Sequence, residues 1–267
     1  MAECSKEEFL RQEMAHKVAQ EDLANEVELW SHLVNTVGPN VEAAYIAKIG
    51  QLEFRLEELE ISIRRWRRRF ELRQTYLNRG EKPDCEKIER TLEDEFQDYL
   101  AALKEREAEI DRGRGLYHCG HMDDSSCTEL RCIYLDAVKK LHPDVNPNLP
   151  ERAVWLWNRI QQAYKAKDWG QMKFLCGMVD DVAGEGRTYP NDAEGLAALV
   201  ADTARMREKC AELSRKIAEL RKEAPLVYQE LIEDPDEVEL RQGELKRQIA
   251  EAEEVVADYE RRWSDGE

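Results

Sequence analysis

Apolar residues recur at helical spacing from near the start of the chain. Ser5 and Glu8 have the spacing of a capping box, so we expect a helix over residues 5–37. Its apolar stripe is Leu10, Met14, Val18, Leu23, Val27, Trp30, Leu33 and Val37. The Gly-Pro-Asn sequence at 38–40 is predicted to end this helix, because glycine and proline commonly follow a helix terminus.

The segment 40–78 has the most regular pattern in the N-terminal half. Spacings of four and three alternate there, which is a heptad seam that requires a partner helix. The seam residues are Tyr45, Ile49, Leu52, Leu56, Leu59, Ile63, Trp66 and Phe70. Turn-forming residues at 78–84 precede a third helix, whose stripe is Ile88, Leu92, Phe96, Tyr99, Leu103 and Ile110. The short turn predicts an antiparallel coiled-coil hairpin over residues 39–114.

A second pair of stripes occupies the C-terminal part of the chain. The first contains Leu196, Leu199, Thr203, Met206, Cys210, Leu213, Ile217 and Leu220, and the second contains Leu245, Ile249, Ala252, Val256, Tyr259 and Trp263. We expect these two helices to form another antiparallel coiled-coil hairpin over residues 183–267. The predicted fold is therefore all-α, with an N-terminal helix at 1–38, two long hairpins, and a small helical domain at 115–182 between them.

Composition agrees with long helices and excludes several classes of protein. Charged residues make up 36% of the 267 and aromatic residues only 7%. The net charge of −17 argues against a nucleic-acid binder. Arg64, Arg65, Arg67, Arg68 and Arg69 surround Trp66, and we interpret them as partners of glutamates on the facing helix.

Targeting signals and cysteine usage indicate where the chain resides. We expect no membrane-spanning helix, because no run of about 18 apolar residues occurs. The acidic N-terminus does not resemble a secretion signal. Seven scattered cysteines suggest free thiols, so the cytoplasm is the expected location.

The stretch 128–169 differs from the rest, because it lacks heptads. Its first helix has an apolar stripe of Ile133, Tyr134, Ala137, Val138 and Leu141, and Pro143 is predicted to end it. After a turn-rich loop at 142–150, a second helix has Trp157, Ile160, Ala163 and Tyr164 on one face. Residues 131–174 include eight Lys or Arg but only four Asp or Glu, so this stretch is basic within an acidic chain. The pattern predicts a small antiparallel hairpin with a polar tip.

The residues of this hairpin resemble the J-domain family of DnaJ-like co-chaperones over about residues 128–175. The matching features are Lys139-Lys140-Leu141-His142-Pro143-Asp144, the Asn-Pro pair at 146–147, and the pattern Trp157-x-x-Ile160-x-x-Ala163-Tyr164. The resemblance implies a hairpin core made of Tyr134, Leu141, Trp157, Ile160, Ala163 and Tyr164. It also implies that His142, Pro143, Asp144, Lys139, Lys140 and Arg131 contact a DnaK-type chaperone and stimulate its ATPase.

The chain also departs from the family pattern. The usual short first helix is not recognisable before Thr128, and we expect the helix whose stripe spans 88–110 to take its place as packing support. Asp136 occupies a helix position that is often basic in active J domains, which would weaken attraction to an acidic partner. No glycine- and phenylalanine-rich linker, zinc-finger module or β-rich client-binding domain follows. An alternative is therefore a structural coiled-coil protein with an inactive J-like domain.

Other chemistry finds little support in the sequence. His118, Cys119, His121, Cys127 and Cys132 invite a zinc site, but they lack a C-x-x-C pair, so we predict no metal and no cofactor. No orienting pair or oxyanion loop accompanies these residues, and we do not expect an enzyme. The expected partners are a DnaK-type chaperone and an unidentified protein client or scaffold bound by the coiled coils. The apolar seams allow pairing within one chain or between two copies in a homodimer.

Overall fold

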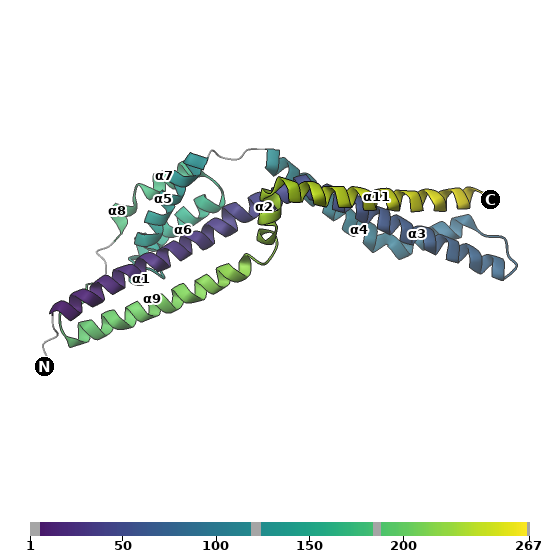
Figure 1. Ribbon diagram of the computed structural model, residues 1–267. Coiled ribbons are helices and arrows are strands. Elements are labelled where there is room, and N and C mark those ends of the chain that lie inside the picture. Colours follow the sequence, from purple (N-terminus) through teal and green to yellow (C-terminus); the bar gives the residue numbers. More distant parts are fainter. Residues whose placement is uncertain (1–5, 119–123, 184–187, 266–267) are drawn as a thin grey trace. The chain divides into compact units, whose positions relative to one another are not determined.

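A computed structural model describes residues 6–118, 124–183 and 188–265, and in these ranges every regular element is a helix and no strand occurs. The chain forms two compact units (Figure 1). Unit 1 combines residues 1–39 with 121–227, and unit 2 combines 40–120 with 228–267. These bounds differ from the four predicted segments, because each unit draws on both halves of the chain.

The backbone remains helical across the predicted break at 38–40. Helix α1 (Lys6–His32) continues into a π-helical turn at Leu33–Val37, and α2 (Gly38–Tyr45) follows directly. The Gly38 N–H donates to the carbonyl of Leu33, five residues earlier. A Cβ atom on Gly38 would lie only 3.1 Å from that carbonyl oxygen. The prediction that the helix stops here is wrong, because this glycine permits a close backbone contact inside the helix instead of ending it.

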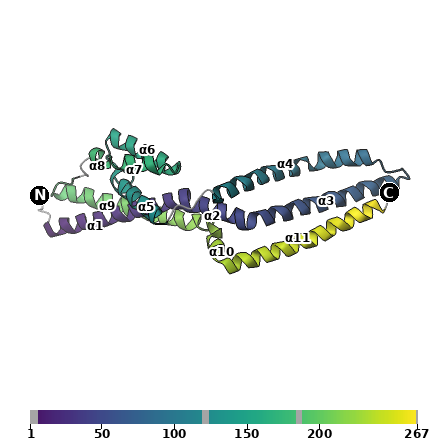
Figure 2. The same cartoon turned by 90° about the horizontal axis from the view of Figure 1, so that it is seen from above.

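Unit 1 is organised around α1 and α9 (Ala193–Leu220), which lie side by side (Figures 1 and 2). They run in the same direction, since the pairs His16–Thr203 and Glu26–Ser214 have nearly equal sequence separations of 187 and 188. Beside them are α5 (Asp124–Leu141), α6 (Glu151–Lys165), α7 (Trp169–Cys176) and α8 (Val179–Val182).

One large core cluster joins these helices of unit 1. Helix α1 contributes Ala19, Leu23, Ala24 and Val27, and α9 contributes Met206. The predicted stripe of α1 holds only in part, because Leu10, Met14 and Val18 are exposed. Small residues at positions 19 and 24 face the core instead, which allows neighbouring helices to approach α1 closely.

Unit 2 contains α3 (Gln51–Asn78), α4 (Cys85–His118), α10 (Gln229–Glu233) and α11 (Pro235–Ser264), with the π turn Ile46–Gly50 before α3. The 3-10 turn Leu226–Tyr228 precedes α10, and its first two residues belong to unit 1. Helix α3 lies between α4 and α11 (Figure 2). Contacts between α3 and α4 are antiparallel, as Arg65–Glu89 and Arg106–Glu57 show.

The heptad seam of α3 is covered by α11 and not mainly by α4. Near one end Arg241 of α11 donates to Glu53 of α3 at 3.3 Å, and near the other end Phe70 meets Trp263 at 5.5 Å between ring centroids. The two helices therefore run parallel. The predicted C-terminal hairpin is wrong, because α9 packs along α1 and α11 packs along α3. Both stripes have the required period, but the period does not specify which partner covers them.

Candidate functional site

The loop after α5 is held by its own backbone and side chains. The His142 N–H continues the helix by donating to the carbonyl of Val138 at 3.0 Å. The His142 carbonyl then accepts from the N–H groups of Val145 and Asn146 at 3.1 and 2.8 Å. The Asn146 amide donates to the Lys139 carbonyl at 2.6 Å. These bonds satisfy the end of α5 and hold the loop in one conformation.

His142 faces the stem of the hairpin. Its ring meets Trp157 edge-on, with 5.1 Å between centroids, and the Asp144 N–H donates to its Nδ1 at 3.1 Å. Since Nδ1 accepts this bond, the proton of the neutral ring is on Nε2. Burial lowers the pKa of His142, the Asp144 carboxylate opposes that shift, and the charge of Lys209 adds to it. The neutral ring therefore fits this environment.

The stem below the loop is an antiparallel pair of helices with an aromatic centre. Tyr134 of α5 stacks on Tyr164 of α6 at 4.2 Å between centroids, and Trp157 lies 5.8 Å from Tyr134. Desolvation raises the pKa of Tyr134 to about 12, while its hydrogen bond to Ser31 acts in the opposite direction. All six residues that the sequence predicted for this core, Tyr134, Leu141, Trp157, Ile160, Ala163 and Tyr164, are buried.

Asp144, the last residue of the tripeptide, forms an ion pair with Lys209 of α9. Burial alone would raise the pKa of the carboxyl group, but the hydrogen bond and charge of Lys209, assisted by His142 and Arg205, hold it below its usual value. Pro143 between them is exposed. The tip thus presents a proline flanked by a ring packed on the stem and a carboxylate paired with another helix.

The three predicted basic contacts have different surroundings. Arg131 donates two hydrogen bonds of 2.8 Å to the carboxylate of Glu28 on α1. Lys140 pairs with Asp180 at 2.6 Å and with Asp136 at 2.9 Å, and both bonds raise its pKa. Lys139 makes no ion pair with a residue in the described ranges.

Helix α1 supplies the packing support that the sequence assigned to the third helix. It contacts α5 directly, whereas α4 belongs to unit 2. Besides the Glu28–Arg131 pair, the Tyr134 hydroxyl donates to Ser31 Oγ at 3.3 Å. Gln20 donates to Asn146 at 3.0 Å, so α1 also touches the loop itself. The residues that pack on α5 within unit 1 thus lie near the start of the chain.

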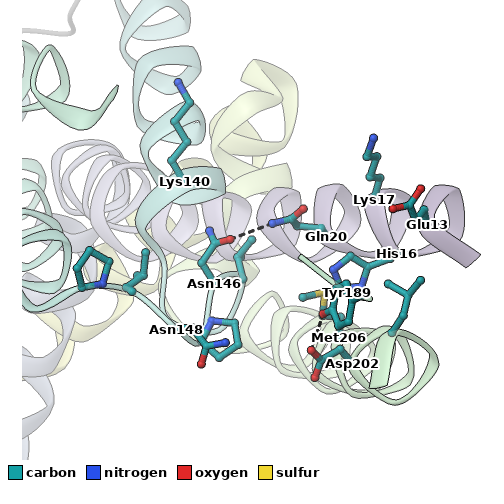
Figure 3. A pocket seen from close by; sticks show the side chains of 15 residues that line it. Glu13, His16, Lys17, Gln20, Lys140, Asn146, Asn148, Tyr189, Asp202 and Met206 are labelled. Carbon is teal, nitrogen blue, oxygen red and sulfur yellow. Dashed lines mark hydrogen bonds between the residues drawn. The ribbon is translucent and has the colours of Figure 1, made fainter. Parts of the chain in front are cut away.

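A small cavity of about 240 Å³ lies beside the tip, between α1, the loop 145–150 and α9 (Figure 3). His16 and Thr203 meet on one side at 3.2 Å, and the Tyr189 hydroxyl donates to Asp202 at 2.6 Å. Since the Thr203 hydroxyl donates to the Leu199 carbonyl, His16 Nδ1 is the donor to Thr203. The cavity is smaller than the roughly 300–1,000 Å³ of typical small-molecule sites, and we assign it no ligand.

Comparisons with protein-family models, with curated proteins and with solved structures find no match. The site is therefore interpreted from its geometry and from the resemblance of its residues alone.

The candidate zinc ligands lie largely outside the residues whose side chains the structure describes. The structure does not describe the side chains of His118, Cys119, His121 and Cys127, whereas Cys132 is an exposed free thiol on α5. Within the described ranges, no three His, Cys, Asp or Glu side chains gather to hold a metal ion. Also within those ranges, no helix is long and apolar enough to cross a membrane.

Sequence reasoning missed the residues that surround the tip from other helices. Glu28, Gln20 and Lys209 are polar residues on long amphipathic helices, and nothing in their spacing separates them from their neighbours. For the arginines around Trp66, the predicted glutamate partners are present, because Arg65 and Arg68 pair with Glu89 and Glu95 of α4 at 3.2 and 2.8 Å.

Proposed function

We propose that this chain is a J-domain-like co-chaperone or adaptor that recruits a DnaK-type chaperone and stimulates its ATPase. The supporting observation is the tip itself: His142-Pro143-Asp144 stands at the end of an antiparallel stem, in a loop closed by its own hydrogen bonds. A loop that is already ordered loses little conformational freedom on binding, so more of its contact energy goes into affinity.

Each part of the tip has a defined role in this proposal. Pro143 is exposed and offers a rigid apolar contact, and Asp144 offers a charged acceptor. Lys139 and Lys140 lie beside the tip on α5 and Arg131 lies farther along it, which is the basic set that the resemblance assigns to the chaperone. The chain supplies no catalytic residue of its own, because ATP hydrolysis belongs to the partner.

The helical arms would bind the other partner. Unit 2 consists of long helices with few candidate catalytic or ligand-binding residues. We therefore propose that it binds an unidentified protein client or scaffold. The proposed location is the cytoplasm. Pairing of two copies through the helices would make a homodimer, and its mass in solution distinguishes that arrangement from a monomer.

The deciding experiment measures ATP turnover by a purified DnaK-type chaperone with and without the full chain. Wild-type protein is expected to raise the turnover, and His142→Gln is expected to abolish the increase while leaving unit 1 folded. Arg152→Gln, an exposed position on α6, is the matched control and should behave as wild type. An unchanged turnover with wild-type protein contradicts the proposal.

One observation favours a second candidate, a structural coiled-coil interaction protein whose J-like domain is inactive. Asp144 and Arg131 are both paired within the chain, with Lys209 and Glu28. In that case the hairpin serves as a spacer and the long helices bind a partner. The ATPase of the chaperone would then stay unchanged while the isolated partner still binds the chain.

A further inference from the structure

Lys209 is brought to the tip by the packing of α9. Met206, about one turn earlier on α9, is buried in the core of unit 1, and Leu213, one turn later, packs against the same core. Between these two anchors the Lys209 ammonium meets the Asp144 carboxylate. Its position therefore follows from apolar contacts on both sides of it, and it is not a lysine that moves freely on the surface.

A second cation on α9 reinforces the field at Asp144. Arg205, one turn before Lys209, contributes to lowering the pKa of Asp144 and lies 3.6 Å from Asp202. Arg205 Nη2 is buried and has no hydrogen-bond partner in the described structure. Lys209 thus pairs directly with the carboxylate of the tip, and the charge of Arg205 acts on that carboxylate in the same direction.

Helix α1 restrains the same site from another direction. Glu28 occupies the guanidinium of Arg131 with two hydrogen bonds, and Gln20 holds the side chain of Asn146 in the loop. Two of the residues through which the tip would meet a partner, Asp144 and Arg131, are therefore already paired with α9 and α1. A partner must replace these contacts before it can make its own.

We propose that α9 masks the tip in the resting protein, with Lys209 competing for Asp144 against the cation of an incoming chaperone. The inference rests on the proposed co-chaperone function and adds that the resting chain binds the chaperone less tightly than it would without Lys209. Asp144 and Lys209 side chains are 50% and 35% exposed, so solvent screens the pair. Masking of this kind corresponds to about a two- to fivefold effect on apparent affinity.

The test compares Lys209→Met, which removes the charge and keeps the aliphatic stem, with Lys209→Arg, which keeps the charge. The control is Lys216→Met, because Lys216 pairs with Glu212 farther along the same helix, at 2.6 Å. The readout is the concentration of full chain that gives half-maximal stimulation of the chaperone ATPase. Lys209→Met should lower this concentration about two- to fivefold, and the other two variants should leave it unchanged.

A second measurement does not depend on the chaperone. Carboxyl NMR of Asp144 should show a pKa that rises in Lys209→Met and stays at the wild-type value in Lys216→Met. An Asp144 titration that is the same in wild type and Lys209→Met overturns the masking. So does stimulation by Lys209→Met that equals or falls below wild type, since a decrease would mean that Lys209 positions the tip for binding.

The two proposals fail in different ways. If Asp144 titrates as expected but neither wild type nor Lys209→Met stimulates the ATPase, the co-chaperone function is wrong and the masking falls with it. If wild type stimulates and Lys209→Met has the same half-maximal concentration, the co-chaperone function stands and only the masking is wrong. In Lys209→Met with His142→Gln, any stimulation should disappear.

Discussion

Removal of the Arg131 side chain's charge should destabilise unit 1 more than most surface substitutions would. In Arg131→Met, the Glu28 carboxylate loses two hydrogen bonds of 2.8 Å. The side chain of Glu28 is only 7% exposed, so water replaces those bonds poorly. Breaking a fully buried pair costs about 3–5 kcal/mol. Because Arg131 is 41% exposed and partly screened, we expect a cost of about 2–3 kcal/mol.

A double-mutant cycle separates the energy of the Glu28–Arg131 ion pair from the cost of burying each side chain. Glu28→Gln keeps the shape and removes the charge, and we expect it to cost about 1–2 kcal/mol. The double variant should cost less than the sum of the two single variants, by about 1–2 kcal/mol, because it leaves no uncompensated carboxylate at this position. The coupling reports how strongly α1 holds α5.

Hydrogen exchange of the α5 and α6 amides is the suitable assay, since the chain has two units and global unfolding need not be two-state. The control is Glu129→Gln, which breaks an exposed pair with Lys173 between α5 and α7 and should cost less than about 0.5 kcal/mol. If Arg131→Met costs no more than this control, or if the cycle is additive, the Glu28–Arg131 pair does not join the two helices.

Further predictions concern the stem and its titratable groups. Tyr134→Ala should cost about 3–5 kcal/mol in the same exchange assay because it empties the aromatic centre, whereas Tyr134→Phe should cost about 1 kcal/mol; equal costs would contradict the stacking. The fold lowers the pKa of His142, so the neutral ring should contribute its full stability above the unfolded pKa of about 6.5. This contribution should be lost as the pH falls from there to the folded pKa. If the denaturant midpoint of wild type relative to that of His142→Gln is the same at pH 7.5 and pH 5, this prediction is refuted. Burial raises the pKa of Cys176 to about 11, so at pH 8 its thiol should react with iodoacetamide far more slowly than exposed Cys132, as peptide mass spectrometry can measure.

The stem of the hairpin could be predicted from local pattern, because its partners lie close in the sequence. Tyr134 and Tyr164 belong to helices joined by one short loop, so an apolar stripe on each helix suffices to place the two rings together. The loop was equally accessible, because Pro143 and the asparagine after it limit the backbone locally. The all-helical fold also followed from composition and period.

The partners of the long helices could not be predicted in the same way. The stripes of α1, α3, α9 and α11 share one period, and any of them could cover another. The tertiary structure decided that α9 packs on α1 and α11 on α3. Glycine commonly ends a helix, but at Gly38 the helix continues through a π turn.

What the sequence determined by itself is the set of local elements: helices, their apolar faces, and a hairpin with His142-Pro143-Asp144 at its tip. What only the tertiary structure decided is the surroundings of that tip. Lys209 reaches Asp144 across 65 residues, and Glu28 reaches Arg131 across 103. Such contacts depend on which faces of distant helices meet. That choice minimises exposed apolar area over a whole unit, and no local spacing encodes it.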